Sequence, residues 1–212
     1  EFNTSKILIS RFCEGTKITN LEKLKEWNIN PEVVAKKIVF TYCEMILNHG
    51  IYHADPHPGN FLVSSEGKLI AIDFGCIKEI PEEFYVPYFE LAKEENINND
   101  KIFMEKLYEL EILTPTDSEE ELQFFTALFK EMLTIFTSPF HKETFDFGDK
   151  VFWAKIANLS ERYSKDEQIR KMNGNRGSKH FLYINRTFFG LYNLLHDLRA
   201  KVEVNHFEKY MD

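Results

Sequence analysis

The chain has 212 residues, 43% of them hydrophobic and 15% aromatic, which is enough apolar surface for one large domain or two small ones. That composition excludes an intrinsically disordered chain, because disordered chains lack the apolar surface that offsets the entropy lost on folding. The 26 basic and 34 acidic residues give a formal net charge of −8. An acidic domain repels a phosphate backbone, so we expect no nucleic-acid partner.

No stretch of the sequence predicts export or a membrane span. Apolar-rich stretches such as 188–196 are much shorter than the roughly 20 residues that cross a bilayer, and no segment has the pattern of a secretion signal. Cys13, Cys43 and Cys76 are far apart, odd in number and without Cys-x-x-Cys spacing. This usage is typical of a reducing compartment and argues against a disulfide framework or structural zinc. We therefore expect a cytoplasmic protein.

The first fifty residues contain signals for one strand and two helices. Ile7–Phe12 is short, apolar and β-branched at its start, as in a strand. Thr19 and Glu22 have the spacing of a capping box, which predicts a short helix. Asn30-Pro31 predicts the start of a longer helix, because Asn caps a helix and Pro is suited to its first position. That helix is predicted to end at Gly50, which can adopt the left-handed conformation of a C-terminal cap.

The rest of the chain changes to strand patterning and then back to helix. Short β-type runs at 51–53, 61–63 and 69–72 are separated by turn residues, with the turn 64–67 between the last two. From there on, apolar spacing predicts helices near 82–95, 99–111, 118–137, 149–164 and 178–201. The predicted fold class is therefore α+β, mainly α, with a small β-hairpin region.

Several features of the helical part have structural interpretations. The apolar stripes of 118–137 and 178–201 are typical of buried helix faces, so we interpret them as core. The acidic run Asp117–Glu121 fits a helix start, where negative charge complements the helix dipole. Turn residues at Asn173-Gly174-Asn175 are predicted to separate the last two helices.

Residues that carry chemistry are concentrated in 50–60 and 69–75. Asp55 and Asn60 are five positions apart, the D-x-x-x-x-N spacing of a kinase catalytic loop, and the loop lies between two apolar strands. Thirteen residues after Asn60, the tripeptide Asp73-Phe74-Gly75 ends an apolar strand, where a metal-binding D-F-G is expected. The spacing therefore predicts a phosphoryl-transfer site.

The residue types fit that chemistry. Phosphoryl transfer depends on positioning and charge neutralisation, so it requires Mg²⁺ held by hard oxygen ligands, which Asn60 and Asp73 can supply. Asp55 is the carboxylate that would orient the acceptor hydroxyl or water and accept its proton. Pro56 and its neighbouring proline stiffen the loop. We interpret His53 as a residue that orients Asp55.

Other interpretations remain open from the residues alone. His53-x-Asp55-x-His57 could form a zinc or iron site, since His and Asp at alternating positions can converge on a metal, or the loop could be an ordinary polar turn. The tripeptide is weak alone, because Asp146-Phe147-Gly148 repeats it. That second copy follows no apparent apolar strand, so we interpret it as a turn at a helix start.

The whole pattern resembles a known family. His53-Ala-Asp-Pro-His-Pro-Gly-Asn60 with Ile72-Asp-Phe-Gly75 resembles the signature of the UbiB family of atypical protein-kinase-like proteins, which are associated with coenzyme Q biosynthesis and lipid metabolism. Residues 7–15 resemble the last small-lobe strand and hinge of that family. The resemblance implies a division into 1–15, strand and hinge, and 16–212, a kinase-like large lobe. Within that lobe it implies helices over 16–50, catalytic and metal-binding loops over 51–75, and a helical remainder over 81–212.

The resemblance also implies roles for individual residues. Asp55 and His53 correspond to the catalytic loop, and Asn60 and Asp73 to the magnesium ligands. Backbone groups near Arg11 and Cys13 would meet the adenine of ATP, although Arg11 stands where the family commonly has an acidic residue. The implied cofactors are ATP and Mg²⁺. The family's phosphate loop and its lysine–glutamine extension are expected upstream of Glu1, outside this chain.

We therefore expect the large lobe of a UbiB-type ATPase or phosphotransferase, active in its full-length context, with a small-molecule or lipid acceptor. The segment 76–80 is too short for the peptide platform of a protein kinase. The resemblance implies quinone-biosynthesis partners and a place peripheral to the inner face of a membrane. Two alternatives stay open: a catalytically silent interaction module, and a phosphotransferase of the aminoglycoside or choline kinase type, whose loops usually read H-G-D.

Overall fold

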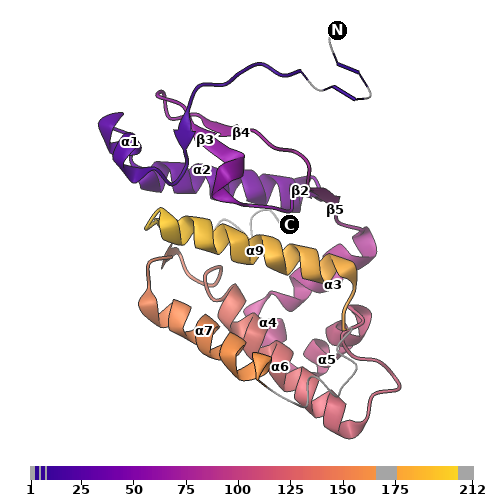
Figure 1. Cartoon of the computed structure of the whole chain (residues 1–212). Coiled ribbons are helices and arrows are strands. Elements are labelled where there is room, and N and C mark those ends of the chain that lie inside the picture. Colours follow the sequence, from indigo (N-terminus) through magenta and orange to yellow (C-terminus); the bar gives the residue numbers. More distant parts are fainter. Residues whose placement is uncertain (1–2, 5, 8, 166–175, 205–212) are drawn as a thin grey trace.

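The chain folds into a mainly helical body with three small antiparallel sheets, as given by a computed structural model that describes residues 3–4, 6–7, 9–165 and 176–204 (Figure 1). The strands are β1 Thr16–Lys17, β2 Ile51–His53, β3 Phe61–Val63, β4 Leu69–Ala71, β5 Ile77–Glu79, β6 Thr144–Asp146 and β7 Lys201–Glu203. The helices are α1 Leu21–Glu26, α2 Pro31–Cys43, α3 Glu82–Leu91, α4 Glu94–Ile97, α5 Asp100–Glu109, α6 Glu119–Thr137, α7 Lys150–Ser164 and α9 Lys179–Asp197. This arrangement confirms the predicted α+β, mainly α class.

The strand predicted at Ile7–Phe12 is wrong for the described residues, which are irregular there. A strand needs a neighbour that accepts its backbone hydrogen bonds, and the described part of the chain offers this segment none. The Phe12 side chain is 86% exposed, and the segment projects away from the body (Figure 1). Regular structure begins after Gly15, whose Cα passes so close to β3 that a Cβ would lie 2.9 Å from the Val63 carbonyl oxygen.

The first two helices begin at asparagine caps. Asn20, not Thr19, caps α1 by accepting a hydrogen bond from the Lys23 amide, so the predicted capping box is wrong by one residue. Asn30 caps α2 with proline at the first helical position, as predicted. After α2 the helix widens into a π-helical turn over Glu44–Asn48 and then ends before Gly50, which has φ of +61°.

Two separate ladders carry the segment that the sequence singled out. In one, β3 pairs on one side with β1 and on the other with β4, all antiparallel. In the other, β2 pairs with β5, with Ile51 opposite Glu79 and His53 opposite Ile77. The three predicted strands are therefore present, and the segment 76–80 supplies a fourth that the sequence did not predict.

The helical part follows the prediction with changes at element ends. The predicted helix 82–95 is divided into α3 and α4, and the predicted helix 178–201 ends at Asp197 instead. Beyond it Arg199 has φ of +50°, and the chain reverses into β7, which pairs with β6. Long-range pairing of this kind has no local sequence signal, which is why helix was predicted to 201. The turn predicted at Asn173-Gly174-Asn175 lies outside the described residues.

Helix α9 is at the centre of the core, with α1 and α2 on one side and α4, α5, α6 and α7 on the other (Figure 1). On one side, Leu191 and Leu195 line a small apolar cavity together with Tyr42 of α2. On the other, the Tyr192 hydroxyl donates a hydrogen bond of 2.7 Å to the Phe136 carbonyl of α6. The apolar stripe predicted as core is thus buried on both sides.

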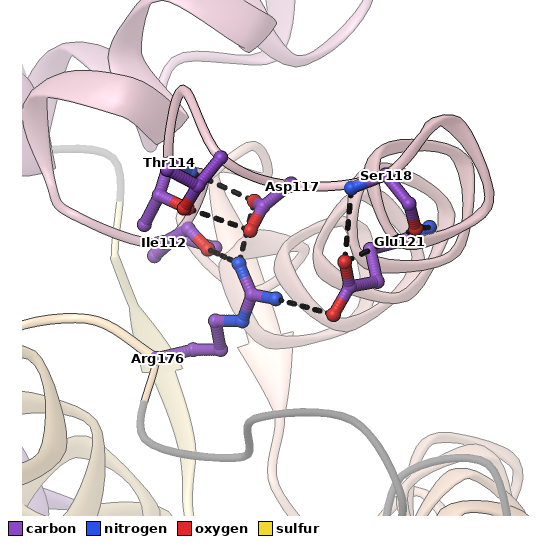
Figure 2. A network of polar contacts seen from close by, with 7 residues as sticks. Ile112, Thr114, Asp117, Ser118, Glu121 and Arg176 are labelled. Carbon is purple, nitrogen blue, oxygen red and sulfur yellow. Dashed lines mark hydrogen bonds and ion pairs between the residues drawn. The ribbon is translucent and has the colours of Figure 1, made fainter.

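A buried ion pair fixes the entry into α9 (Figure 2). The Arg176 guanidinium donates to the Asp117 carboxylate, to Glu121 and to the Ile112 carbonyl, and it stacks 4.2 Å from the ring centre of Phe125. The Arg176 and Asp117 side chains are only 6% and 5% exposed. The acidic run therefore does more than begin α6: it also holds Arg176, three residues before α9 begins.

Candidate active site

The loop after β2 is shaped by two local devices. Pro58 occupies the first position of a 3₁₀ turn, Pro58–Asn60, where its missing N–H leaves no donor unpaired. His57 caps that turn, because its Nδ1 accepts a hydrogen bond of 3.0 Å from the Gly59 N–H. The turn delivers the chain directly into β3 and so places Asn60 at the start of that strand.

Backbone hydrogen bonds then join this loop to the Asp73-Phe74-Gly75 loop. The Ala54 N–H donates to the Cys76 carbonyl at 2.7 Å, and the Ile72 N–H donates to the Asn60 carbonyl at 3.0 Å. One bond extends the β2–β5 ladder and the other extends the β3–β4 ladder. The two loops are consequently held side by side at both of their ends.

His53 makes the connection between the two loops. Its Nδ1 accepts a hydrogen bond of 3.2 Å from the Asp55 N–H, and its Nε2 lies 2.8 Å from the Asp73 carbonyl oxygen. An N–H can only donate and a carbonyl can only accept, so the neutral ring carries its proton on Nε2. Because His53 is 3% exposed and both ring nitrogens are engaged, it orients Asp55 and Asp73 and has no free nitrogen for proton transfer.

The oxygens left free suit a divalent cation. The Asn60 amide nitrogen donates to the Asp55 carbonyl at 3.0 Å and to its Oδ2 at 3.2 Å, which leaves Asn60 Oδ1 as an acceptor. Asp73 Oδ1 accepts from the Gly75 N–H at 2.7 Å, which leaves Oδ2. Within the described residues, neither Asp55 nor Asp73 forms an ion pair. Hard oxygens beside uncompensated negative charge are the donor set that Mg²⁺ prefers.

A transition-metal site at His53-x-Asp55-x-His57 does not fit this geometry. Both nitrogens of His53 and the Nδ1 of His57 already have backbone partners. In the part of the chain that the structure describes, no three His, Cys, Asp or Glu side chains converge as a metal site requires.

Arg11 and Cys13 are not brought to these residues. Both are exposed in the irregular N-terminal segment, where the Cys13 thiol makes only a weak contact, 3.7 Å, with the Arg11 carbonyl. No hydrogen bond joins the described residues of that segment to Asp55, Asn60 or Asp73. Their role next to a nucleotide stays a prediction.

Behind the loop lies the buried side chain of Tyr42. Burial, and secondarily the nearby Asp55 carboxylate, raises the pKa of the Tyr42 phenol well above its ordinary value of 10. The ring packs edge-on against Phe61, and its hydroxyl finds no hydrogen-bond partner among the described residues. Tyr42 therefore supports the loop by packing, with a neutral hydroxyl.

The sequence prediction missed the face of α9 that lies against the loop. A pocket of about 240 Å³ separates the two, with Asp55 and His57 on the loop side and Arg186 on the helix side. Gly190 approaches the loop so closely that a Cβ would meet Pro56 Cγ at 2.6 Å. Gly190 is the sequence signal that could have indicated this face of α9. A glycine inside a helix costs about 1 kcal/mol relative to Ala, so its presence suggests a close packing contact.

Comparisons with known proteins agree with this geometry. The sequence profile of the ABC1 atypical kinase-like domain matches residues 1–107, half of the chain. The chain belongs to the ABC1 atypical kinase-like family. This confirms the resemblance to the UbiB family, because relatives of this chain are named ABC1 or AarF-domain kinases.

Two relatives show the extent of the similarity. The ABC1 chain is 28% identical over 182 residues to Protein ACTIVITY OF BC1 COMPLEX KINASE 8, chloroplastic, of Arabidopsis thaliana, which covers 79% of this chain and 23% of the relative. It is 33% identical over 96 residues to AarF domain-containing protein kinase 1 of Xenopus tropicalis, covering 43% and 18%. The chain thus spans about a fifth of the length of the curated relatives it matches.

A solved structure supports the ABC1 chain's fold. The chain in the complex structure of Rv3197 with erythromycin, from Mycobacterium tuberculosis, superposes with a TM-score of 0.64 at 17% identity. The match covers 95% of this chain and 49% of that one. Among the helices described here, none is both long and apolar enough to cross a membrane.

Proposed function

We propose that this chain is the large lobe of an ABC1-family ATPase or phosphotransferase that uses Mg-ATP. The single observation that supports it best is the His53 bridge, which holds Asp55 and Asp73 in two loops while Asn60 contacts Asp55 directly. The backbones of the two loops that carry these three oxygen-bearing side chains are thereby joined, and the spacing of the residues is that of a kinase. Because the chain covers only about a fifth of the length of its relatives, the proposal refers to the full-length protein.

Each residue has a distinct part in this proposal. Asn60 Oδ1 and Asp73 Oδ2 would hold Mg²⁺, which supplies charge neutralisation for the phosphates of ATP. Asp55 accepts a hydrogen bond from the acceptor O–H and takes its proton as the oxygen attacks the γ-phosphorus. The bond between that phosphorus and the ADP oxygen breaks, and the proton passes from Asp55 to solvent. With water as acceptor the same step is ATP hydrolysis.

The acceptor we propose is a small molecule or a lipid. The segment 76–80 is taken up almost entirely by β5 and runs straight into α3 at Glu82, so it offers no platform for a peptide. A role in quinone or lipid metabolism, at the inner face of a membrane, rests on the family resemblance. A catalytically silent interaction module is the alternative outcome.

The protein contains a matched control for the test. Asp73 and Asp146 begin identical tripeptides and make the same turn, since each Oδ1 accepts from the glycine N–H two residues later at 2.7 Å. Asparagine preserves this acceptor at either position and removes the charge. In the full-length protein, D73N should weaken Mg²⁺-dependent ATP binding about tenfold or more, and D146N should leave it within twofold.

The affinities of D73N and D146N are compared by equilibrium titration with a fluorescent ATP analogue, with and without Mg²⁺. Equal weakening by both variants would show a general effect of charge and not a metal site. Unchanged binding in D73N would overturn the proposal. ATP turnover that survives D55N at full rate would separately exclude Asp55 from the reaction.

A further inference from the structure

The pocket between the loop and α9 opens directly onto Asp55. It holds about 240 Å³ and is lined on the loop side by Asp55 and His57 and on the helix side by Arg186 and Phe189. Each wall therefore combines polar and apolar side chains, and Phe189 on the helix side is 39% exposed. A pocket with a few convergent polar groups beside a reactive carboxylate is the ordinary form of a small-molecule site.

Arg186 is a cation without a partner in the part of the chain that the structure describes. It makes no hydrogen bond or ion pair with any residue in the described ranges, and it is exposed on α9. The positions three and four residues away, where a carboxylate could pair with it, hold Leu182 and Tyr183 on one side and Phe189 and Gly190 on the other. Its guanidinium is thus free to bind a carboxylate or phosphate with two parallel hydrogen bonds.

His57 adds a second donor on the opposite wall. Its Nδ1 accepts from the Gly59 N–H at 3.0 Å, so the neutral ring carries its proton on Nε2. The ring is exposed and lines the pocket two residues from Asp55. A cation and a fixed N–H donor therefore face the same space.

The width of the pocket is set by a direct contact between helix and loop. Gly190 lies against Pro56, where an added Cβ would meet Cγ at 2.6 Å. Pro56 is itself buried, so it cannot swing away. Arg186 is one helical turn before this contact, about 6 Å along the axis, and of the α9 residues that line the pocket it comes first in the sequence.

The opposite end carries a negative charge. Asp197 also lines the pocket and is eleven residues beyond Arg186, about 16 Å along the helix. It repels a second anionic group there. The charges therefore favour a molecule with one anionic end.

We propose that this pocket is the acceptor subsite and takes a small, hydroxyl-bearing molecule with a single phosphate or carboxylate. Arg186 and His57 hold the anionic group, and the hydroxyl faces Asp55. This inference rests on the proposed function for the role of Asp55. The binding itself requires neither ATP nor Mg²⁺, which allows the two proposals to be tested apart.

The test is isothermal titration calorimetry of this chain in metal-free buffer with three probes: glycerol 3-phosphate, glycerate and glycerol. We expect saturable binding of one or both anionic probes at millimolar concentrations, and none of glycerol. Whether glycerol 3-phosphate or glycerate binds more tightly shows whether the pocket prefers a phosphate or a carboxylate. R186Q should weaken binding about tenfold or more, and R186K should weaken it less, because lysine keeps the charge without the planar fork.

Lys179 provides the matched control. It lies on α9 two turns before Arg186, about 10 Å away along the axis, and is exposed outside the pocket. K179Q removes the same charge from the same helix and should change affinity less than twofold. Equal loss in R186Q and K179Q, binding of glycerol as tight as that of the anions, or no binding of either anion would overturn the subsite.

A further variant separates this inference from the proposed function. D73N should bind glycerol 3-phosphate like the unaltered chain, because Asp73 does not line the pocket. If D73N leaves ATP binding intact while R186Q abolishes binding of the anion, the proposed function fails and the anion site stands. The reverse pattern removes the subsite and leaves the ATPase proposal in place.

Discussion

The His53 ring donates from Nε2 to the Asp73 carbonyl at 2.8 Å, across twenty residues of sequence. Its other nitrogen accepts from the Asp55 N–H, so one buried side chain determines the spacing of the two carboxylates. Neither bond involves a carboxylate oxygen. The ring therefore fixes the two backbones, and among the described residues Asp55 Oδ1 and Asp73 Oδ2 keep no hydrogen-bond partner and stay free for a ligand.

Substitution of His53 should separate its two bonds. H53Q keeps a donor near the position of Nε2, and H53N keeps an acceptor near that of Nδ1, whereas H53A removes both. Because a buried polar group without a partner costs about 1–3 kcal/mol, H53A should lower the free energy of unfolding by at least that amount. Mg²⁺-dependent ATP affinity should fall more in H53N than in H53Q, since only glutamine can still hold Asp73. Urea denaturation and nucleotide titration measure the two effects, and equal ATP affinity in all three variants would contradict the bridge.

The acid dependence of stability should follow Asp117. Burial opposes ionisation of this carboxyl, but hydrogen bonds from Arg176 and Thr114 outweigh it and hold its pKa below the ordinary value of 3.8. A lowered folded-state pKa contributes stability that is fully present above about pH 4 and is lost as the pH falls below it. D117N should therefore flatten the dependence of the free energy of unfolding between about pH 4 and pH 2. If the free energy of unfolding of D117N depended on pH in the same way as that of the unaltered protein, Asp117 would not be the source of the acid dependence.

The partner of Asp117 can be tested at neutral pH. R176M leaves a buried carboxylate without its cation and should cost about 3–5 kcal/mol. The double variant R176M/D117N removes the stranded charge and should recover part of that loss, which a double-mutant cycle measures. Additive costs would mean that the contact in Figure 2 contributes no coupling.

Removal of the hydroxyl should change the stability of the protein in opposite directions at two buried tyrosines. Tyr42 and Tyr192 are each 1% exposed, but among the described residues only the Tyr192 hydroxyl has a partner, the Phe136 carbonyl. Y42F removes an unsatisfied group and should leave stability unchanged or raise it by about 1 kcal/mol, whereas Y192F should lower it by about 1 kcal/mol. Thermal and urea unfolding compare them. A larger loss in Y42F than in Y192F would reveal a partner for Tyr42.

Gly190 offers a test of the contact between α9 and the loop. In an open helix interior, Gly to Ala stabilises by about 1 kcal/mol. Here the added Cβ would lie 2.6 Å from Pro56 Cγ, so G190A should instead cost about 1–3 kcal/mol. P56A removes the clashing carbon, and the double variant should recover much of that cost. A stabilising G190A on its own would contradict the close approach.

The two D-F-G tripeptides show how far local sequence reaches. Each forms the same turn, with Oδ1 of its aspartate bonded to the glycine N–H. The second was predicted to follow no apolar strand and to form a turn at a helix start; its aspartate ends the short strand β6, in which only Phe145 is buried, and α7 begins two residues after its glycine. What distinguishes them is their surroundings: Phe147 is 1% exposed in the core, and Phe74 is 67% exposed. The turn is determined by residues next to each other in the sequence, whereas the burial of its phenylalanine depends on tertiary packing.

The loop from His53 to Asn60 could be predicted as a chemical site because its residue types and spacing are confined to eight positions. The helix start at Asn30 was predicted from its Asn-Pro cap, and the start near 118 from the acidic run that complements the helix dipole; both are present in the structure. The prediction of a strand at Ile7–Phe12 was wrong because a strand is stable only when it pairs with a neighbouring strand. The local sequence does not indicate whether such a neighbour is present.

The sequence by itself determined the family, the mainly helical class and the candidate catalytic residues, because motif spacing, helix caps and apolar periodicity are all short-range properties. Only the tertiary structure decided that His53 ties Asp55 to Asp73 and that Arg186 faces the same pocket as Asp55. Arg186 and Asp55 are 131 positions apart in the sequence. Contacts at that separation arise from packing α9 against the loop through Gly190, and packing depends on the shapes of both partners at once.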